Sequence, residues 1–312
     1  MKRYILLTLA TVLTSMHVSA TETDYRTGTE KILQKDSLKV LDIGNSYTDD
    51  ATALLPLITS ASGSDISKMC LYKAVRGGAS FKTWYDTYNN QDFKDYSIKK
   101  VLGGMSANIA TGSGEAFDGA LFRDALTNEL WDVIIIHQVS DFAPYYEHWF
   151  GNNAGGYLNE LLEIIKSCQP QAAIGFLLIH SYWSGYWGNT EKSSFDRWQL
   201  IANSAKKLLE DKKVDFIIPY GTAVQNLRNS SLNNGYDLTR DGTHLDYGLA
   251  RYTAACCYYQ SIIYTRSGIS ILGNTARHDV SQQNSEYPSV TVDDKNAETA
   301  QKVAVLATIY PY

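Results

Sequence analysis

The chain has 312 residues, is 44% hydrophobic and carries a formal net charge of −5 at pH 7. That length allows one large α/β domain or two small ones. A mildly acidic chain lacks the basic surface that nucleic acids and anionic membrane surfaces attract, so the composition argues against both partners.

Residues 1–20 have the pattern of a secretory signal peptide. Lys2 and Arg3 precede an apolar run at residues 4–14 that is too short to span a bilayer, and small residues at 18–20 suit cleavage. No later stretch is apolar for long enough to insert into a membrane. We therefore expect an exported protein, periplasmic or secreted, with a polar lead at residues 21–37 and a single domain at residues 38–312.

The first predicted strand, residues 38–43, ends in the turn Gly44-Asn45-Ser46, and a helix is predicted over residues 51–61. An apolar run bounded by turn residues is typical of a strand buried on both faces. Ser46 would then lie at the carboxyl end of a strand, where ligands bind in open α/β sheets. Serine also commonly caps a helix, so this stretch alone leaves both roles open.

The rest of the chain alternates strands with helices. Further strands are predicted at residues 66–75, 131–137, 172–179 and 214–219. Helices are predicted from about residue 81 and at residues 122–130, 156–168, 195–210, 222–228, 245–264 and 297–309. This alternation predicts a three-layer α/β/α fold with a five-stranded parallel sheet, in which the turns after the first four strands meet at one edge. The middle of residues 90–130 has no clear pattern.

Two turns at that predicted edge carry groups of interest. The second strand ends in Gly77-Gly78, where the absence of side chains lets a backbone N–H approach a ligand, although an ordinary strand-to-helix turn fits equally well. Gln138 follows the third strand, residues 131–137. The four cysteines lie in apolar or helical stretches, which is typical of buried free thiols.

Asp241 and His244 lie three positions apart, just before the long helix predicted at residues 245–264. This spacing lets the carboxylate reach the imidazole within one loop, where it would fix the ring tautomer and stabilise the imidazolium. Histidine is the common general base, and a serine hydroxyl needs one to become a nucleophile. On its own the pair is equally compatible with a surface loop.

Together, Gly44-Asn45-Ser46, Gly78, Gln138 and Asp241-x-x-His244 resemble the SGNH (GDSL-type) hydrolases. The closest resemblance is to a bacterial branch known as a domain of unknown function, through the first turn, the Gly-Gly turn, the strand ending in glutamine and residues 238–252. The resemblance covers residues 38–265 and implies a flavodoxin-like fold.

The resemblance implies a role for each motif residue. Ser46 would be the nucleophile, Asp241 would orient His244, and His244 would act as general base and then general acid. The N–H groups of Ser46 and Gly78 would form the oxyanion hole. Most family members carry an asparagine in a Gly-x-Asn-Asp block as a third donor; here Gln138 would serve with a longer side chain.

Aromatic residues are dense in the loops after the third and fourth strands. Flat aromatic faces with polar tips pack well against sugar rings, although they could equally cover the end of the core. With export, this favours an ester on a carbohydrate, most simply an O-acetyl group, and no cofactor or metal. The residues expected to contact the sugar are Tyr146, Trp149, Tyr182, Trp183 and Trp187.

Two other functions remain open from the sequence. One is a metal-dependent phosphoesterase, and the other is a glycan-binding protein with an inactive site. Oxygen and imidazole ligands for the phosphoesterase would come from Asp49, Asp50, Asp241, His244 and His137. His137 could equally be a satisfied buried histidine, and Asp246 is expected to place its charge at a helix amino end.

Overall fold

The computed structural model describes residues 32–90, 95–113 and 119–312. The predicted signal peptide and most of the predicted lead lie outside these residues. Among the helices of the described ranges, none is long and apolar enough to cross a membrane.

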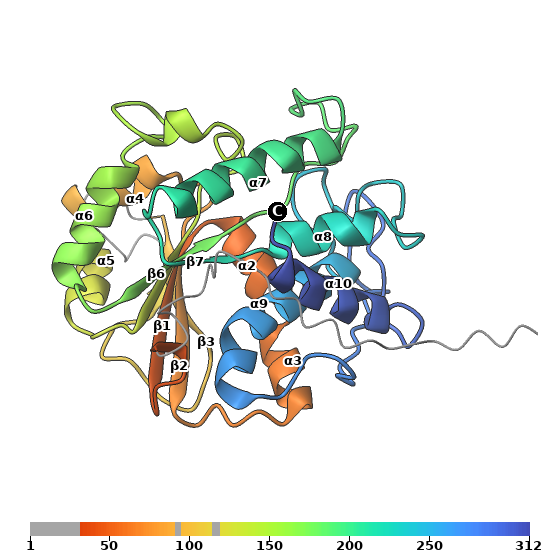
Figure 1. The fold of residues 1–312 in the computed structure, drawn as a ribbon, viewed down its shortest axis with the longest axis horizontal. Helices are drawn as coiled ribbons and strands as arrows, with labels where there is room; N and C mark the ends of the chain where they lie inside the picture. Colours follow the sequence, from red (N-terminus) through yellow and green to blue (C-terminus); the bar gives the residue numbers. More distant parts are fainter. Residues whose placement is uncertain (1–31, 91–94, 114–118) are drawn as a thin grey trace, which may run out of the picture.

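A seven-stranded sheet runs through the middle of the molecule (Figure 1). Its strand order is β4-β3-β2-β1-β5-β6-β7. The five strands from β2 to β7 are parallel, while β3 is antiparallel to β2 and β4 is antiparallel to β3. The strands are β1 (Leu38–Gly44), β2 (Met69–Val75), β3 (Ser97–Leu102), β4 (Gly112–Ser113), β5 (Val133–Ile136), β6 (Ala173–Leu177) and β7 (Phe216–Ile218).

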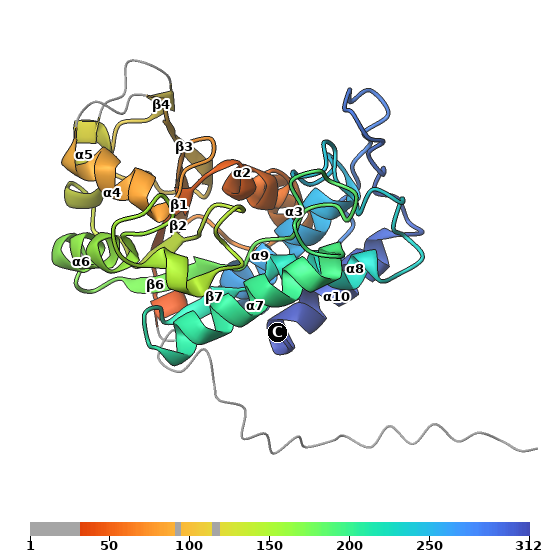
Figure 2. The same cartoon turned by 90° about the horizontal axis from the view of Figure 1, so that it is seen from above.

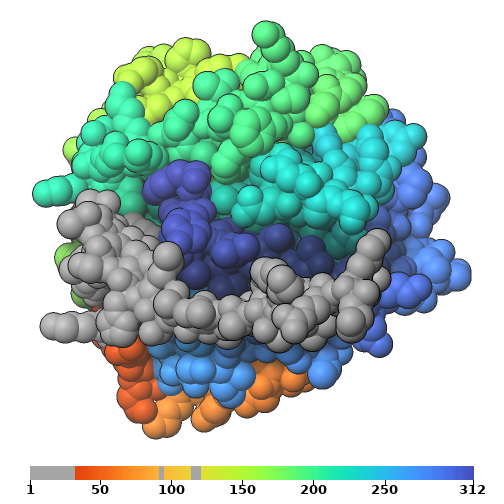
Figure 3. Space-filling view, turned by 45° about the vertical axis from the view of Figure 1, so that its right-hand side comes forward, coloured from red at the N-terminus to blue at the C-terminus, as the bar shows by residue number. Residues whose placement is uncertain are grey.

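Helices cover both faces of the sheet, which confirms the predicted three-layer α/β/α fold (Figures 1 and 2). On one face α4, α5 and α6 pack together, and on the other α9 packs against α2, α3, α8 and α10. Figure 3 shows α8 beside α10, with α7 next to them. The helices are α2 (Ser46–Thr52), α3 (Leu55–Ser62), α4 (Phe81–Asn89), α5 (Gly119–Thr127), the 3-10 helix η1 (Tyr146–Trp149), α6 (Leu158–Cys168), α7 (Ser194–Glu210), α8 (Tyr220–Arg228), α9 (Leu249–Ser267) and α10 (Ala297–Ile309).

The five predicted strands are the five parallel strands of the sheet; β1 is one residue longer than predicted, and the other four are shorter. The sequence did not predict β3 and β4, which extend the sheet beyond β2. Strand β3 carries Lys99 and Lys100 in its middle, and both are exposed. Charged side chains of this kind are common on strands near a sheet edge, where they discourage pairing with other molecules, and they hide the apolar alternation by which strands are recognised.

The helix predicted over residues 51–61 is wrong in its extent. The structure has two helices there, and the first begins at Ser46, five residues earlier than expected. Asn45 is its cap, because the Asn45 side chain accepts the N–H of Tyr47. The second helix restarts with Pro56 in its first turn, where a missing N–H is tolerated.

The core lies on both sides of the parallel strands. Strands β1, β5 and β6 are buried along almost their whole length, as expected for strands covered on both faces. Helix α9 is buried over most of its residues because α2, α3, α8 and α10 surround it. Among the described residues, Cys256 and Cys257 of this helix form no disulfide, and neither do Cys70 and Cys168. Three of the four are buried, as predicted, and Cys168 is half-buried.

Candidate active site

Ser46 lies where β1 ends and α2 begins. Because Asn45 caps the helix, the Ser46 hydroxyl is not used for capping. Instead, Ser46 Oγ lies 2.8 Å from Nε2 of His244, a residue 198 positions away in the chain. The alternative that Ser46 serves as the cap is therefore wrong, and its hydroxyl faces an imidazole.

The three residues Ser46, His244 and Asp241 form a continuous line of hydrogen bonds. Nδ1 of His244 lies 2.7 Å from Oδ2 of Asp241. A proton on Nδ1 is donated to the carboxylate, which leaves Nε2 as the acceptor for the serine hydroxyl. The His244 and Asp241 side chains keep 28% and 36% of their surface exposed, so the line is open to a ligand.

Asp241 is held as a carboxylate. Its burial opposes ionisation, but the hydrogen bond from the His244 ring and the N–H groups of His244 and Thr243 outweigh burial and lower the pKa of Asp241. These two N–H groups both bind Oδ1, at 2.7 and 3.0 Å. The other oxygen, Oδ2, is thereby left to orient the imidazole.

Two buried aromatic residues fix the loop that carries His244. The Tyr47 hydroxyl donates to the carbonyl oxygen of Thr243 at 2.8 Å, and Nε2 of His180 lies 2.7 Å from the same oxygen. The Tyr47 and His180 rings stack with their centroids 4.3 Å apart. Burial lowers the pKa of His180 well below its ordinary range, so this ring is neutral. His180 therefore supports the loop next to His244, and it lies outside the line formed by Ser46, His244 and Asp241.

The turn at Gly77-Gly78 lies beside the Ser46 turn. The Asn45 side chain links the two, because its Nδ2 donates to the carbonyl oxygen of Ala79 at 3.0 Å. Gly78 has φ +65°, a conformation that favours glycine, and open space lies where a side chain would project. Within the described part of the chain, neither the Ser46 N–H nor the Gly78 N–H has a protein acceptor. The two N–H donors predicted for an oxyanion are thus not used by any protein group of the described residues.

Gln138, the predicted third donor, is fully buried and already engaged. Its Nε2 donates to the carbonyl oxygen of Gly155 at 2.7 Å, and its Oε1 accepts the N–H of Val139 at 2.9 Å. The neighbouring Ala154 carbonyl accepts the Ser80 hydroxyl. Gln138 and Ser80 thus hold the 154–155 segment from two sides, and only one of the Gln138 amide hydrogens remains for other use.

His137 lies underneath the nucleophile turn and is fully buried. Its Nε2 accepts the N–H of Asn45 at 3.2 Å and lies 2.9 Å from the Thr48 hydroxyl. Burial lowers the pKa of His137 to about 4, so the ring is a neutral acceptor. A Cβ on Gly44 would lie 2.0 Å from this nitrogen, which explains the glycine.

The carboxylates considered for a phosphoesterase have other partners. Asp50 is fully buried and faces the guanidinium groups of Arg240 and Arg251, and Asp49 pairs with Lys73 at 2.7 Å. Positive side chains in these positions compete with a cation. In residues 32–90, 95–113 and 119–312, no group of three or more His, Cys, Asp or Glu side chains is arranged to hold a metal ion.

The aromatic residues predicted to bind substrate fall into three groups. Trp149 is fully buried between Phe81 and Phe176, so the prediction that it contacts a sugar is wrong. Tyr182 is also buried, with its hydroxyl bound to Ser140 and Asp141. A large ring at the end of a strand can complete the core, and the sequence does not distinguish that use from a binding role.

Trp183 and Trp187 remain accessible. Trp187 is 90% exposed and packs on Tyr186, with ring centroids 5.2 Å apart. Tyr186 in turn lies against Gly242, where an added Cβ would approach its ring to 2.7 Å. The backbone N–H of Trp183 donates to the Gly242 carbonyl at 2.8 Å. These aromatics therefore border the loop that carries Asp241 and His244.

Sequence reasoning missed two members of this border, Tyr236 and Tyr287. Their rings stack at 4.5 Å, and each lies about 5 Å from the Trp183 ring. Tyr287 comes from a segment without regular structure, and its N–H donates to the carbonyl of Arg240. Long-range contacts of this kind bring it to the site, and no local sequence pattern signals them.

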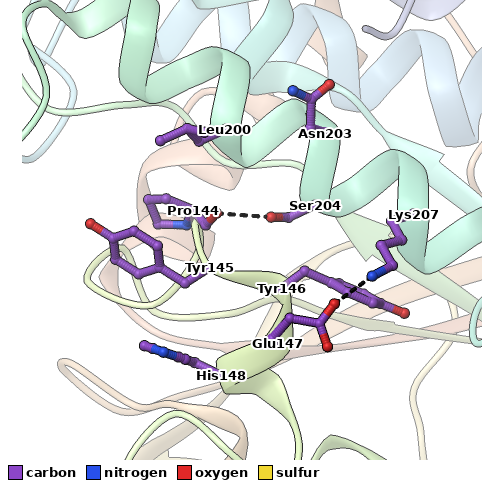
Figure 4. A pocket seen from close by; sticks show the side chains of 9 residues that line it. All are labelled: Pro144, Tyr145, Tyr146, Glu147, His148, Leu200, Asn203, Ser204 and Lys207. Atoms are coloured by element: carbon purple, nitrogen blue, oxygen red, sulfur yellow. Dashed lines mark hydrogen bonds and ion pairs between the residues drawn. The ribbon is translucent and has the colours of Figure 1, made fainter.

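Tyr146 lines a different feature, an open surface pocket of about 340 Å³ between η1 and α7 (Figure 4). The pocket includes Leu200 and Ser204 of α7, and Lys207 pairs with Glu147 at its rim. None of its lining residues belongs to the triad. The structure therefore does not bring Tyr146 together with the predicted site.

Asp246 behaves as predicted. Its Oδ1 accepts the N–H groups of Gly248 and Ala250 at the start of α9, at 3.2 and 2.8 Å. Its Oδ2 accepts the N–H of Val290 at 2.9 Å. Burial raises the pKa of Asp246 to about 7, against the effect of these three hydrogen bonds.

Comparisons with known proteins agree with this architecture. Residues 39–304 match the family DUF4886, described as a domain of unknown function. A solved DUF4886 family protein from Bacteroides uniformis ATCC 8492 is 26% identical, with a TM-score of 0.68 over 88% of this chain and 96% of that chain. The comparison with curated proteins found no match.

The comparison with solved structures also found two proteins of lower similarity. A catalytic mutant of an acetylxylan esterase from Geobacillus stearothermophilus is 12% identical, with a TM-score of 0.46 over 73% of this chain and 96% of that chain. A GDSL-like lipase from Bacteroides thetaiotaomicron VPI-5482 is 11% identical, with a TM-score of 0.38 over 77% of this chain and 97% of that chain. By its match over residues 39–304, the chain belongs to the DUF4886 family, the branch that its sequence motifs predicted.

Proposed function

We propose that this protein is an SGNH-type serine esterase. The observation that carries the proposal is the hydrogen-bonded line from Ser46 through His244 to Asp241, whose Ser46 end lies beside the turn of Gly78. The N–H groups of Ser46 and Gly78 have no acceptor among the described residues. A nucleophile, a base and an orienting carboxylate within hydrogen-bond reach are the arrangement that acyl transfer requires.

The proposed reaction has two halves. His244 Nε2 takes the Ser46 proton as Oγ attacks the ester carbonyl, and Asp241 stabilises the imidazolium that forms. The Ser46 and Gly78 N–H groups bind the developing oxyanion, and each such donor contributes about 2.7–4 kcal/mol to the transition state. His244 then protonates the leaving alcohol. Water releases the acyl group by the same steps in reverse, with His244 again acting as the base.

We further propose that the ester is an O-acetyl group on a carbohydrate. Trp187 exposes nearly its whole ring beside the loop of Asp241. The backbone N–H of Trp183 donates to Gly242 of that loop, so Trp183 lies against it. A large exposed aromatic face suits the apolar face of a sugar ring. The signal-peptide pattern of residues 1–20 supports action in the periplasm or outside the cell, where polysaccharides are met.

Hydrolysis of p-nitrophenyl acetate in chelator tests the reaction. The wild type should hydrolyse it, and Ser46→Ala should lose at least about 10³-fold in kcat. Wild-type activity in Ser46→Ala would refute the proposal, and activity lost only with chelator would favour the phosphoesterase. A protein that binds acetylated polysaccharide without releasing acetate, unchanged in Ser46→Ala, would be a glycan-binding protein with an inactive site.

A further inference from the structure

Ser46 and Asp50 are one turn apart on α2, so they project from the same face of the helix. Ser46 reaches His244, while Asp50 is fully buried among groups from the loop that carries His244. One short rigid element thus presents both the nucleophile and a buried carboxylate to the same loop.

The Asp50 carboxylate has four donors. Its Oδ1 receives Nη1 of Arg240 at 2.8 Å, and Nε and Nη2 of Arg251 at 3.0 and 2.7 Å. Its Oδ2 accepts the N–H of Leu245 at 2.9 Å. Buried carboxylates persist only when they are paired and hydrogen-bonded in this way.

Two of these donors flank the pair Asp241 and His244. Arg240 comes directly before Asp241, and Leu245 comes directly after His244. Arg240 also closes the loop on itself, because its N–H donates to the His244 carbonyl and its guanidinium donates to the Leu245 carbonyl. Asp50 therefore binds both ends of the segment that contains Asp241 and His244.

We propose that Asp50 is a positioning residue, which sets the distance between Ser46 Oγ and His244 Nε2 by fixing this loop to α2. The inference rests on the proposed function and adds a residue that the family motif does not contain. The Asp241–His244 contact lies within one loop, so it does not need Asp50. The Ser46–His244 contact joins the helix to the loop, so it does.

Asp50→Asn keeps the shape of the side chain and removes its charge. We expect kcat on p-nitrophenyl acetate to fall by about 10- to 100-fold, since a displacement of about 1 Å can cost that much. The KM should stay within about twofold, because the acyl-binding surface is intact. The low-field proton resonance of His244 Nδ1–H should persist, whereas Asp241→Asn should abolish it.

The matched control is Asp49→Asn. Asp49 is the neighbouring carboxylate on α2, is 47% exposed and pairs with Lys73, so it reports the effect of losing a charge on this helix without the loop contacts. Its kcat should equal that of the wild type. An equal fall in Asp49→Asn and Asp50→Asn would overturn the inference.

Asp50→Asn leaves two guanidinium groups without their counter-charge, which could reduce folding. The double variant Asp50→Asn/Arg251→Met removes one of these cations, and it should recover the Tm while kcat stays low. Arg240→Met removes the Nη1 group that donates to both Asp50 and the Leu245 carbonyl, and its kcat should fall about tenfold. Recovery of wild-type kcat together with Tm in the double variant, or wild-type kcat in Arg240→Met, would show a purely structural role. Ser46→Ala tests the esterase itself, so the two failures are distinguishable.

Discussion

The Asn45 side chain joins the two turns that supply the candidate oxyanion donors, because its Nδ2 donates to the Ala79 carbonyl oxygen at 3.0 Å. Its Oδ1 simultaneously accepts the N–H of Tyr47 and caps α2. A single amide thus fixes the start of the nucleophile helix and its distance from Gly78.

Asn45→Ala should therefore affect both stability and catalysis. Loss of the cap should lower the free energy of unfolding by about 1 kcal/mol. Loss of the link to Ala79 should let the N–H groups of Ser46 and Gly78 separate, and kcat should fall by about tenfold. Urea denaturation and p-nitrophenyl acetate kinetics measure the two effects.

Ser193→Ala is the control for this variant. Ser193 caps α7 through the N–H of Asp196 at 3.1 Å and takes no part in the candidate site. It should lose similar stability with unchanged kcat. If Asn45→Ala also keeps wild-type kcat, the link between the two turns has no catalytic importance.

Gly44→Ala tests the packing beneath the nucleophile. The new Cβ would lie 2.0 Å from His137 Nε2 and 2.3 Å from Thr48 Oγ1, and both side chains are buried. Overpacking of this kind typically costs about 1–3 kcal/mol. We expect thermal unfolding at a lower temperature and a lower kcat, because Asn45 and Ser46 must move. An unchanged Tm would show that this turn is loosely packed.

Asp42→Asn tests the pH dependence of stability. Burial raises the pKa of Asp42 to about 7, although hydrogen bonds from Thr48 and Tyr258 oppose it. Between its ordinary pKa and this value, the folded protein holds a proton that the unfolded chain has released. The stability contributed by Asp42 therefore falls as pH rises through that window.

The corresponding measurement compares urea denaturation of the wild type and Asp42→Asn at about pH 5 and about pH 8. The stability of the wild type relative to the variant should fall by roughly 2–3 kcal/mol, since each pKa unit is worth about 1.36 kcal/mol. Asp246 is present in both proteins, so the effect of its own raised pKa on stability cancels in the comparison. A difference that does not change with pH would mean that the Asp42 carboxyl titrates normally.

Trp187→Ala tests the carbohydrate substrate. Release of acetate from an acetylated polysaccharide that the wild type hydrolyses should show a KM raised by about three- to tenfold, because one aromatic stacking surface is lost. Hydrolysis of p-nitrophenyl acetate should not change. Tyr310→Ala, which removes another exposed ring that is 63% accessible, should leave both substrates unaffected. Equal KM values for the polysaccharide in all three proteins would contradict a sugar platform at Trp187.

The parallel part of the fold was predictable because its strands are continuous apolar runs bounded by turns. The same reasoning could not find β3, where Lys99 and Lys100 face solvent and obscure the alternation. It also joined α2 and α3 into one helix, since the role of Asn45 as the cap depends on a side-chain contact that the sequence does not show.

The site was predictable where spacing is local or the motif is specific. Asp241 and His244 meet within one loop, and Ser46 follows the first strand. The aromatic predictions were less accurate, because Trp149 completes the core and Trp187 faces solvent although both follow strands. From the sequence, Asp50 was only a possible metal ligand, since its partners Arg240 and Arg251 lie 190 and 201 positions away.

Active-site labelling tests the central claim most directly. The purified protein would be treated with a fluorophosphonate, which reacts with an activated serine, and the adduct located by mass spectrometry. We predict a single adduct on Ser46 of the wild type and none on His244→Ala under the same exposure. An adduct on a different residue, or labelling of His244→Ala at the wild-type rate, would contradict the account.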